Sequence, residues 1–177
     1  SPRGLVWPPL PPEDKEAWAR VKKVGAFFNP HVTTCGAAIE ASKPQQLATY
    51  PYPIATTYAT QPVDQVYSIT KAMIDGYDLY KDSAPGSVGL EAKRQTKQWV
   101  IPFHPGAAKA LKEAGNWTDA DEKYNNDLIK RQGVLADAWK AYNTASTPAE
   151  ADKFLSGWMA ARKAALAKAN LPNGFEE

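Results

Sequence analysis

Two short polar stretches contain residue types that can bind a solute without covalent chemistry. They are Thr33-Thr34-Cys35-Gly36 and Thr56-Thr57-Tyr58. Hydroxyl groups and backbone amides at the ends of strands can line a cleft and hydrogen-bond to a polar solute. The alternative is ordinary strand propensity, because Thr and Tyr are common in strands. The resulting candidates for ligand binding are Thr33, Thr34, Gly36, Thr56, Thr57 and Tyr58.

His31 and Cys35 are four residues apart, and such a pair raises the question of nucleophilic catalysis. On an extended segment, however, that spacing separates the two residues by about 13 Å. No carboxylate lies near in sequence to orient the histidine. We therefore predict that the chain has no catalytic residue and is a binding protein, not an enzyme.

His104 precedes a predicted helix over residues 106–114, and the free N–H groups at such a helix start favour an anion. One hypothesis is a carboxylate site at this position. The other is that His104 caps the helix, while the small residues Gly106-Ala107-Ala108 permit close packing against a neighbour. The sequence favours the second.

Composition argues against metals, cofactors and nucleic acid. Cys35 is the only cysteine, which excludes a disulfide within the chain and a zinc site built on paired cysteines. The acidic cluster Asp119-Asp121-Glu122 lies in a predicted first helical turn and lacks the pattern of a calcium loop. Glycine-rich phosphate loops are absent. With a net charge of +2 and interleaved lysines, no basic stripe for nucleic acid is evident.

The elements that must position these residues are few strands early in the chain and many helices later. Pro12 suits the first turn of a helix over residues 13–24. Extended segments follow at 26–28 and 31–34, interrupted by Asn29-Pro30. Apolar spacing and capping patterns then predict further helices, which begin at Pro62, residue 106, Thr118 and Thr147. The last helix is expected to bury Phe154, Leu155, Trp158 and Leu166.

The stretch Thr49–Ile54, TYPYPI, looks like a strand but carries two prolines. Pro51 and Pro53 are two apart, so their missing N–H groups point toward one edge, and the segment can pair only on the other. It is therefore an edge strand or a stiff connector between two bodies. The hinge candidates are Tyr50, Pro51, Tyr52 and Pro53. The alternative is a proline-protected sheet edge that avoids aggregation.

Several ordered motifs resemble the TAXI family of TRAP-transporter solute receptors: SPRGLVWPPLPPEDKEAWARVKK, TCGAAI, TYPYPIATTYA, VYSITKAMIDGYD and WVIPFHPGAAKALKEAGNW. The resemblance covers residues 1–140 and concerns the C-terminal half of such receptors. It implies an α/β fold, a portion of a type II periplasmic-binding-protein lobe. We expect residues 1–48 to end one lobe, 49–61 to be a crossover strand, 62–146 to be helical and 147–177 to be a helical extension.

The same resemblance implies a function. Such receptors capture small organic anions, dicarboxylates or acidic amino acids, in the periplasm for a sodium-coupled permease. Arg3 and Trp7, in the proline-rich arm, would then lie near the lobe interface, where Arg can pair with a carboxylate. Since the chain begins at Ser1, we expect a processed product or fragment, a signal peptide in the precursor, and a missing half or second chain. The alternative is an interaction module that self-associates, as a homo-oligomer, or docks on a partner without binding solute.

Overall fold

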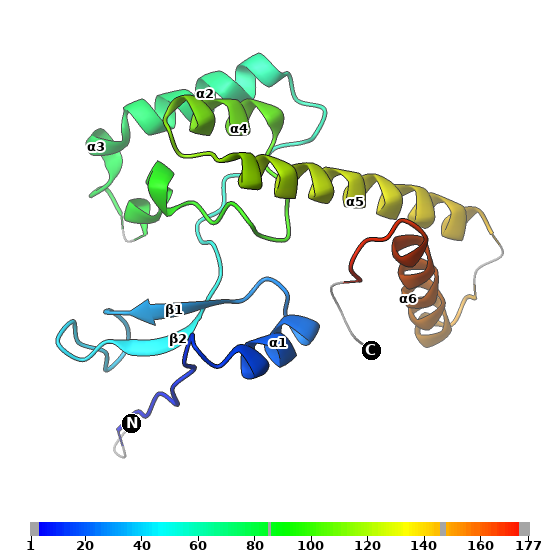
Figure 1. The fold of residues 1–177 in the computed structure, drawn as a ribbon, viewed down its shortest axis with the longest axis horizontal. Helices are drawn as coiled ribbons and strands as arrows, with labels where there is room; N and C mark the ends of the chain where they lie inside the picture. The colour runs from blue at the N-terminus through cyan, green and yellow to red at the C-terminus, as the bar shows by residue number, and fades with distance from the viewer. Residues whose placement is uncertain (1–3, 85, 146–147, 174–177) are drawn as a thin grey trace. The chain divides into compact units, whose positions relative to one another are not determined.

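The computed structural model describes residues 4–84, 86–145 and 148–173. The described residues form a mixed α/β structure with six α-helices and one two-stranded sheet (Figure 1). They separate into two compact units, the first ending at Tyr50 and the second spanning Pro51–Asn173. Each unit holds its own secondary structure.

The first unit consists of one helix and a β-hairpin. Helix α1, Lys15–Val24, begins after Asp14, whose carboxylate accepts a hydrogen bond from Ala17 N. Strands β1, Asn29–Thr33, and β2, Gln45–Thr49, pair antiparallel with Asn29 opposite Thr49. The arm that precedes α1 is tied to the hairpin by a bond from Leu10 N to Gln46 O.

Two predictions for this unit are wrong. Pro12 does not start the helix, because Asp14 supplies the cap two residues later. Asn29-Pro30 does not interrupt the extended chain but begins β1, whereas residues 26–28 are not a strand. In a two-stranded sheet one edge of β1 has no neighbouring strand, so a proline whose nitrogen faces that edge removes no ladder bond.

The predicted crossover strand over residues 49–61 is also wrong. Strand β2 ends at Thr49, and residues 50–60 have no strand pairing. The segment is a connector, the alternative that the sequence leaves open beside an edge strand. The Tyr52–Pro53 peptide bond is cis.

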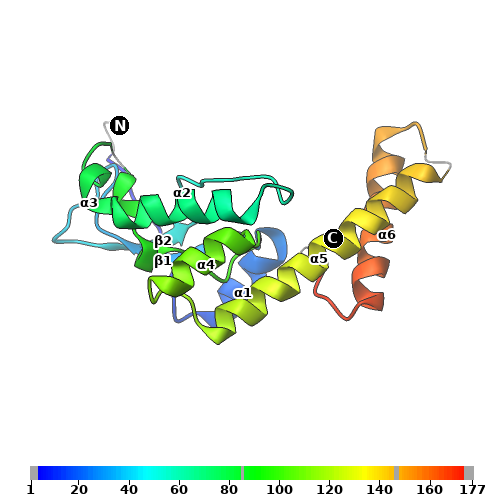
Figure 2. The ribbon, with the colours of Figure 1, turned by 90° about the horizontal axis from the view of Figure 1, so that it is seen from above.

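The second unit is built on two helices that pack side by side, α2, Val63–Asp75, and α4, Pro105–Glu113 (Figures 1 and 2). Gly106 permits their close approach, because a Cβ there would overlap Val63 O and lie 2.7 Å from Tyr67 N. Short helices occupy the chain between them: α3, Tyr77–Tyr80, and two 3₁₀ turns, Ser87–Leu90 and Ala92–Arg94. The core beneath α4 is Ala108, Leu111 and Trp117, with Ile74, Ala92 and Phe103 packed against it.

Helices α5, Asp119–Thr144, and α6, Ala151–Lys168, form a hairpin in which α6 packs on the C-terminal part of α5 (Figure 2). The predicted capping box is confirmed at Thr118 and Asp121. The second box is wrong, since Glu150 is the N-cap of α6 without a side-chain bond, and Thr147 lies outside the described residues. Aromatic rings hold the hairpin together at Trp139, Tyr142, Phe154 and Trp158, with the ring centroids of Trp139 and Trp158 4.8 Å apart.

The prediction that Leu155 is buried in this interface is wrong, because its side chain is 59% exposed. It lies beside Phe154 in the sequence, and neighbouring residues on a helix do not share a face. None of the helices in the described part of the chain is long and apolar enough to span a membrane.

Candidate functional site

The first unit contains an open hollow of about 350 Å³ beside the β-hairpin, which we call the hairpin hollow. It brings together three of the predicted ligand-binding residues, Trp7, Thr33 and Gly36, with His31 and Thr49. Its other lining residues are Cys35, Ala37, Ile39, Leu47 and Ala48. Thr34 is exposed next to the hollow in sequence but does not line it.

Side-chain hydrogen bonds fix the wall of the hairpin hollow. The indole N–H of Trp7 donates to Ala37 O at 2.9 Å, across thirty residues of sequence. Thr33 Oγ1 donates to Cys35 O at 2.9 Å and accepts from Cys35 N at 3.4 Å. Gly36 has a φ of +144°, a backbone conformation that favours glycine, and the chain turns there toward Ile39. The arm and the turn are thereby held against each other.

The lining of the hairpin hollow mixes polar and apolar residues and contains no acidic side chain. None of its ten lining residues is Asp or Glu, and His31 contributes an imidazole that can donate a hydrogen bond. Cys35 is exposed, and its sulfur lies 4.0 Å from Thr33 Oγ1. Across the described residues, no group of three or more His, Cys, Asp and Glu side chains is placed to hold a metal ion.

The remaining sequence candidates lie elsewhere. Thr56, Thr57 and Tyr58 belong to the second unit, where they are exposed and line neither the hairpin hollow nor the cavity of their own unit. Tyr58 is 81% exposed. Arg3 lies outside the described residues. Of the hinge candidates, Tyr50 ends the first unit, and Pro51, Tyr52 and Pro53 begin the second.

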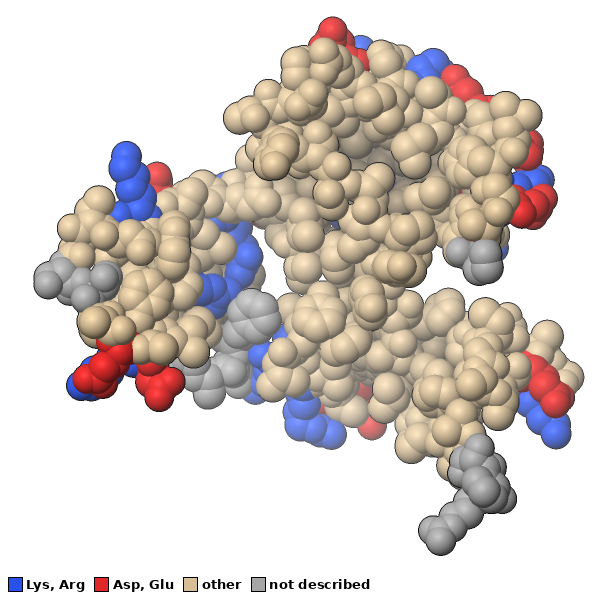
Figure 3. Space-filling model, turned by 180° about the vertical axis from the view of Figure 1, so that it is seen from behind, with Lys and Arg blue, Asp and Glu red and all other residues tan. Residues whose placement is uncertain are grey.

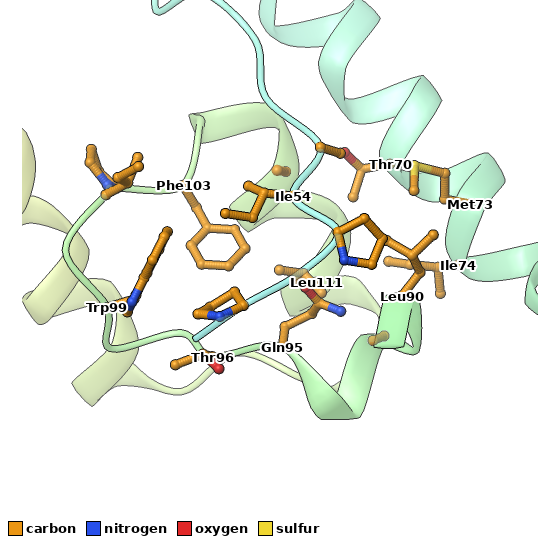
Figure 4. A pocket seen from close by; sticks show the side chains of 17 residues that line it. Ile54, Thr70, Met73, Ile74, Leu90, Gln95, Thr96, Trp99, Phe103 and Leu111 are labelled. Atoms are coloured by element: carbon orange, nitrogen blue, oxygen red, sulfur yellow. The ribbon is translucent and has the colours of Figure 1, made fainter. Parts of the chain in front are cut away.

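The cavity of the second unit has a volume of about 180 Å³, and we call it the proline pocket (Figure 4). Pro51 and Pro53 of TYPYPI form part of its wall. The rest comes from Ile54 and Ala55, from α2, from the 3₁₀ turns and the stretch that follows them, and from α4. None of the seventeen lining residues is charged, and most are apolar, including Ile54, Met73, Ile74, Leu90, Trp99, Ile101, Phe103 and Leu111.

Sequence reasoning missed the proline pocket, because its residues come from separate parts of the chain. The apolar run Trp99-Val100-Ile101 is visible in the sequence, but nothing local indicates which segments it faces. Phe103 is fixed by Asn125 of α5, whose Oδ1 accepts from Phe103 N at 2.7 Å and whose Nδ2 donates to Phe103 O at 3.1 Å. Its ring stands edge-on to Trp117, with centroids 5.4 Å apart. The Tyr124 hydroxyl donates to Trp99 O at 2.8 Å.

His104 acts as a helix cap, as the second sequence hypothesis predicts. Its Nδ1 accepts a hydrogen bond from Gly106 N at 3.1 Å, and its Nε2 lies 3.1 Å from Gln61 O. A neutral imidazole protonated at Nε2 satisfies both contacts. The Gly106 N–H is therefore used within the chain, which removes one of the donors that the carboxylate hypothesis needs.

Figure 3 shows Lys and Arg side chains next to Asp and Glu at several places on the surface. Ion pairs such as Lys71–Asp75 and Lys81–Asp78 join neighbouring turns of one helix or loop. None of these charged side chains lines the proline pocket.

Comparison with protein families places the chain among relatives of solute-binding proteins. The model of the NMT1-like family matches residues 13–115, more than half of the 177 residues. The chain belongs to the NMT1-like family, which is related to extracytoplasmic solute-binding proteins. The match runs from the start of α1 past the end of α4 and leaves the α5–α6 hairpin outside. No curated protein and no solved structure gives a match.

Proposed function

We propose that the chain is the solute-binding component of a periplasmic TRAP transport system, which captures a small organic anion for a sodium-coupled permease. Dicarboxylates and acidic amino acids are the proposed solutes. The observation that carries the proposal is the NMT1-like match, because it covers β1, β2 and the turn around Gly36 that form the hairpin hollow.

The lining of the hairpin hollow supports an anionic solute. Its volume of about 350 Å³ is within the usual range of ligand pockets, roughly 300–1,000 Å³. A nearby negative charge would disfavour the ionised form of a bound carboxylate. None of the lining residues carries one. We assign His31 and Thr49 as solute contacts, together with the backbone at Gly36, while Trp7 and Thr33 shape the wall.

The other candidates retain proposed roles. Thr34, Thr56, Thr57, Tyr58 and Arg3 are proposed to contact the solute once a second lobe, from a longer chain or a partner chain, completes the receptor. Tyr50, Pro51, Tyr52 and Pro53 are proposed as the hinge for lobe closure. What supports the hinge is the division of the chain into compact units between Tyr50 and Pro51.

The test is a thermal shift and calorimetry screen of the purified chain against succinate, malate, glutamate and aspartate. A solute that binds the folded state raises the melting temperature, and the rise grows with the logarithm of its concentration above Kd. His31→Ala should abolish that shift, whereas the same change at an exposed position outside the family match, Lys140→Ala, should leave it intact. If none of the carboxylates shifts the melting temperature, the proposal of an anion receptor is wrong for this chain.

The α5–α6 hairpin favours a second candidate function, an interaction module that self-associates or docks on a partner. This hairpin lies outside the family match. Three of its large apolar residues are exposed to solvent, Ile129 at 42%, Trp139 at 44% and Leu155 at 59%. Measurement of mass in solution tests it. A dimer that Leu155→Glu converts to monomer supports the module, and a monomer at all concentrations contradicts self-association.

A further inference from the structure

We infer that the proline pocket is a second ligand site, which binds an uncharged aromatic ring carrying an N–H or O–H donor, such as a phenol or an indole. This inference goes beyond the proposed function, which places an organic anion in the hairpin hollow of the other unit. It rests on the size, lining and hydrogen bonding of the proline pocket alone.

The size of the proline pocket fits a ring. Its volume is about 180 Å³. An apolar cavity of roughly 150 Å³ in another protein stays dry and binds benzene, so this space accommodates one ring or a fused pair. Figure 4 shows Ile54, Trp99, Phe103 and Leu111 around the same space.

The lining excludes a charged group inside the pocket. No Asp, Glu, Lys, Arg or His is among its seventeen residues. Transfer of an ionised carboxylate or ammonium into such surroundings without a partner is strongly unfavourable. Aromatic walls such as Trp99 and Phe103 favour a ring over an aliphatic chain, because ring pairs gain stabilisation beyond the area they bury.

Gln95 supplies the polar contact. Its side-chain Nε2 donates to Gly89 O at 3.0 Å and to Glu91 O at 2.9 Å, so both N–H bonds are used. Its Oε1 has no donor among the residues that the structure describes. This oxygen is not fully buried, so a ligand N–H or O–H group can replace water as its hydrogen-bond donor. This selects a ring N–H or O–H over an unsubstituted ring.

The walls are held before any ligand binds. Asn125 bonds both backbone groups of Phe103, and Tyr124 bonds Trp99 O. Gln95 is anchored by the two carbonyls that accept its N–H groups. Because these side chains are already ordered, little conformational entropy is lost on binding.

The experiment titrates the full chain with phenol, indole, toluene and benzoate, followed by NMR. Phenol and indole should bind, and should move the methyl signals of Ile54, Met73 and Leu111. Toluene should bind about fivefold to tenfold more weakly, since it cannot bond to Gln95 Oε1. Benzoate should be weaker than phenol by at least about tenfold. Equal binding of phenol and toluene, or no binding of either, overturns the inference.

Variants localise the effect. Ala55→Trp, at an exposed position of the pocket lining, should reduce the free volume and weaken phenol at least about tenfold. Ala136→Trp, an equal change on exposed α5 surface, should not. Gln95→Met should remove the preference for phenol over toluene. Unchanged phenol affinity in folded Ala55→Trp overturns the inference. If the chain binds a dicarboxylate but no phenol or indole, the proposed function stands and this inference is wrong. If it binds phenol or indole but no dicarboxylate, this inference stands and the proposed function is wrong.

Discussion

Asn125 in α5 satisfies both backbone polar groups of Phe103, twenty-two residues earlier in the chain. Asn125 is only 3% exposed, so water cannot replace either bond without a local opening. This pair joins the start of α5 to the loop that carries a wall of the proline pocket.

Substitution Asn125→Ala should therefore destabilise the chain by about 2–4 kcal/mol, because it leaves a buried N–H and a buried C=O without partners. Urea denaturation measures the change. Asn126→Ala is the matched control, since Asn126 is exposed and its bond to Glu122 is 3.5 Å long. Equal effects of the two changes would contradict the structural role of Asn125.

Two glycines should respond in opposite directions to alanine. A Cβ at Gly106 would overlap Val63 O, so Gly106→Ala should force α4 away from α2 at a cost of about 3 kcal/mol. Gly133, within α5, has open space where a Cβ would stand, with no atom within 4 Å, so Gly133→Ala should stabilise by about 0.5–1 kcal/mol. Thermal melting of both variants checks the sign. Stabilisation by Gly106→Ala would rule out the close approach of the two helices.

Acid should weaken the start of α5. Burial by itself raises the pKa of Asp121, but hydrogen bonds from the backbone N–H and hydroxyl of Thr118, together with Gln98 and the charge of Lys97, hold the pKa below its ordinary value of 3.8. Since the folded pKa lies below the unfolded one, the contribution of Asp121 is present above about pH 4 and is lost as the pH falls through the folded pKa.

Asp121→Asn should therefore lower the free energy of unfolding near neutral pH, and the gap from the native chain should narrow below about pH 3. Urea denaturation at a series of pH values measures it. Asp152→Asn, an equal change of charge on the exposed first turn of α6, is the control. A gap that stays constant with pH would contradict the role assigned to the Thr118 bonds.

The helical hairpin should depend on Trp158. Its ring contacts Trp139 at 4.8 Å and Tyr142 at 5.9 Å between centroids, so Trp158→Ala should destabilise by about 2 kcal/mol. Leu155→Ala should change stability by less than about 0.5 kcal/mol, because Leu155 is 59% exposed. Urea denaturation of both variants measures the change in stability, and near-ultraviolet circular dichroism reports the loss of aromatic packing. A larger effect from Leu155 would mean that α6 packs through its other face.

Local patterns are sufficient to predict most of the helices and two of their caps. The Thr118–Asp121 box and the His104 cap depend on residues within three positions of each other, and both predictions are confirmed. The prediction for Asn29-Pro30 fails because the effect of a proline depends on which sheet edge its nitrogen faces. The aromatic residues of TYPYPI have strand propensity, which is why the segment resembles a strand. The prediction fails because residues 50–60 have no partner strand.

The candidate site is predictable only in part, because some of its residues are brought together by contacts between distant segments. Thr33 and Gly36 are close in sequence, so their common turn can be anticipated, and Trp7 joins them through a bond across thirty residues. The proline pocket needs Pro53, Thr70, Gln95 and Phe103 to converge, and such convergence depends on packing between distant segments. No spacing rule within one segment encodes it.

Trp18 is the one large hydrophobic side chain that is buried in the described part of the first unit, whereas the second buries several. Amide hydrogen exchange should reflect this inequality, because protection rises with the apolar burial that an opening must undo. The amides of β1 and β2 should exchange with solvent well before those of α4. The unit that carries the hairpin hollow is therefore expected to open first, while the unit that carries the proline pocket stays folded.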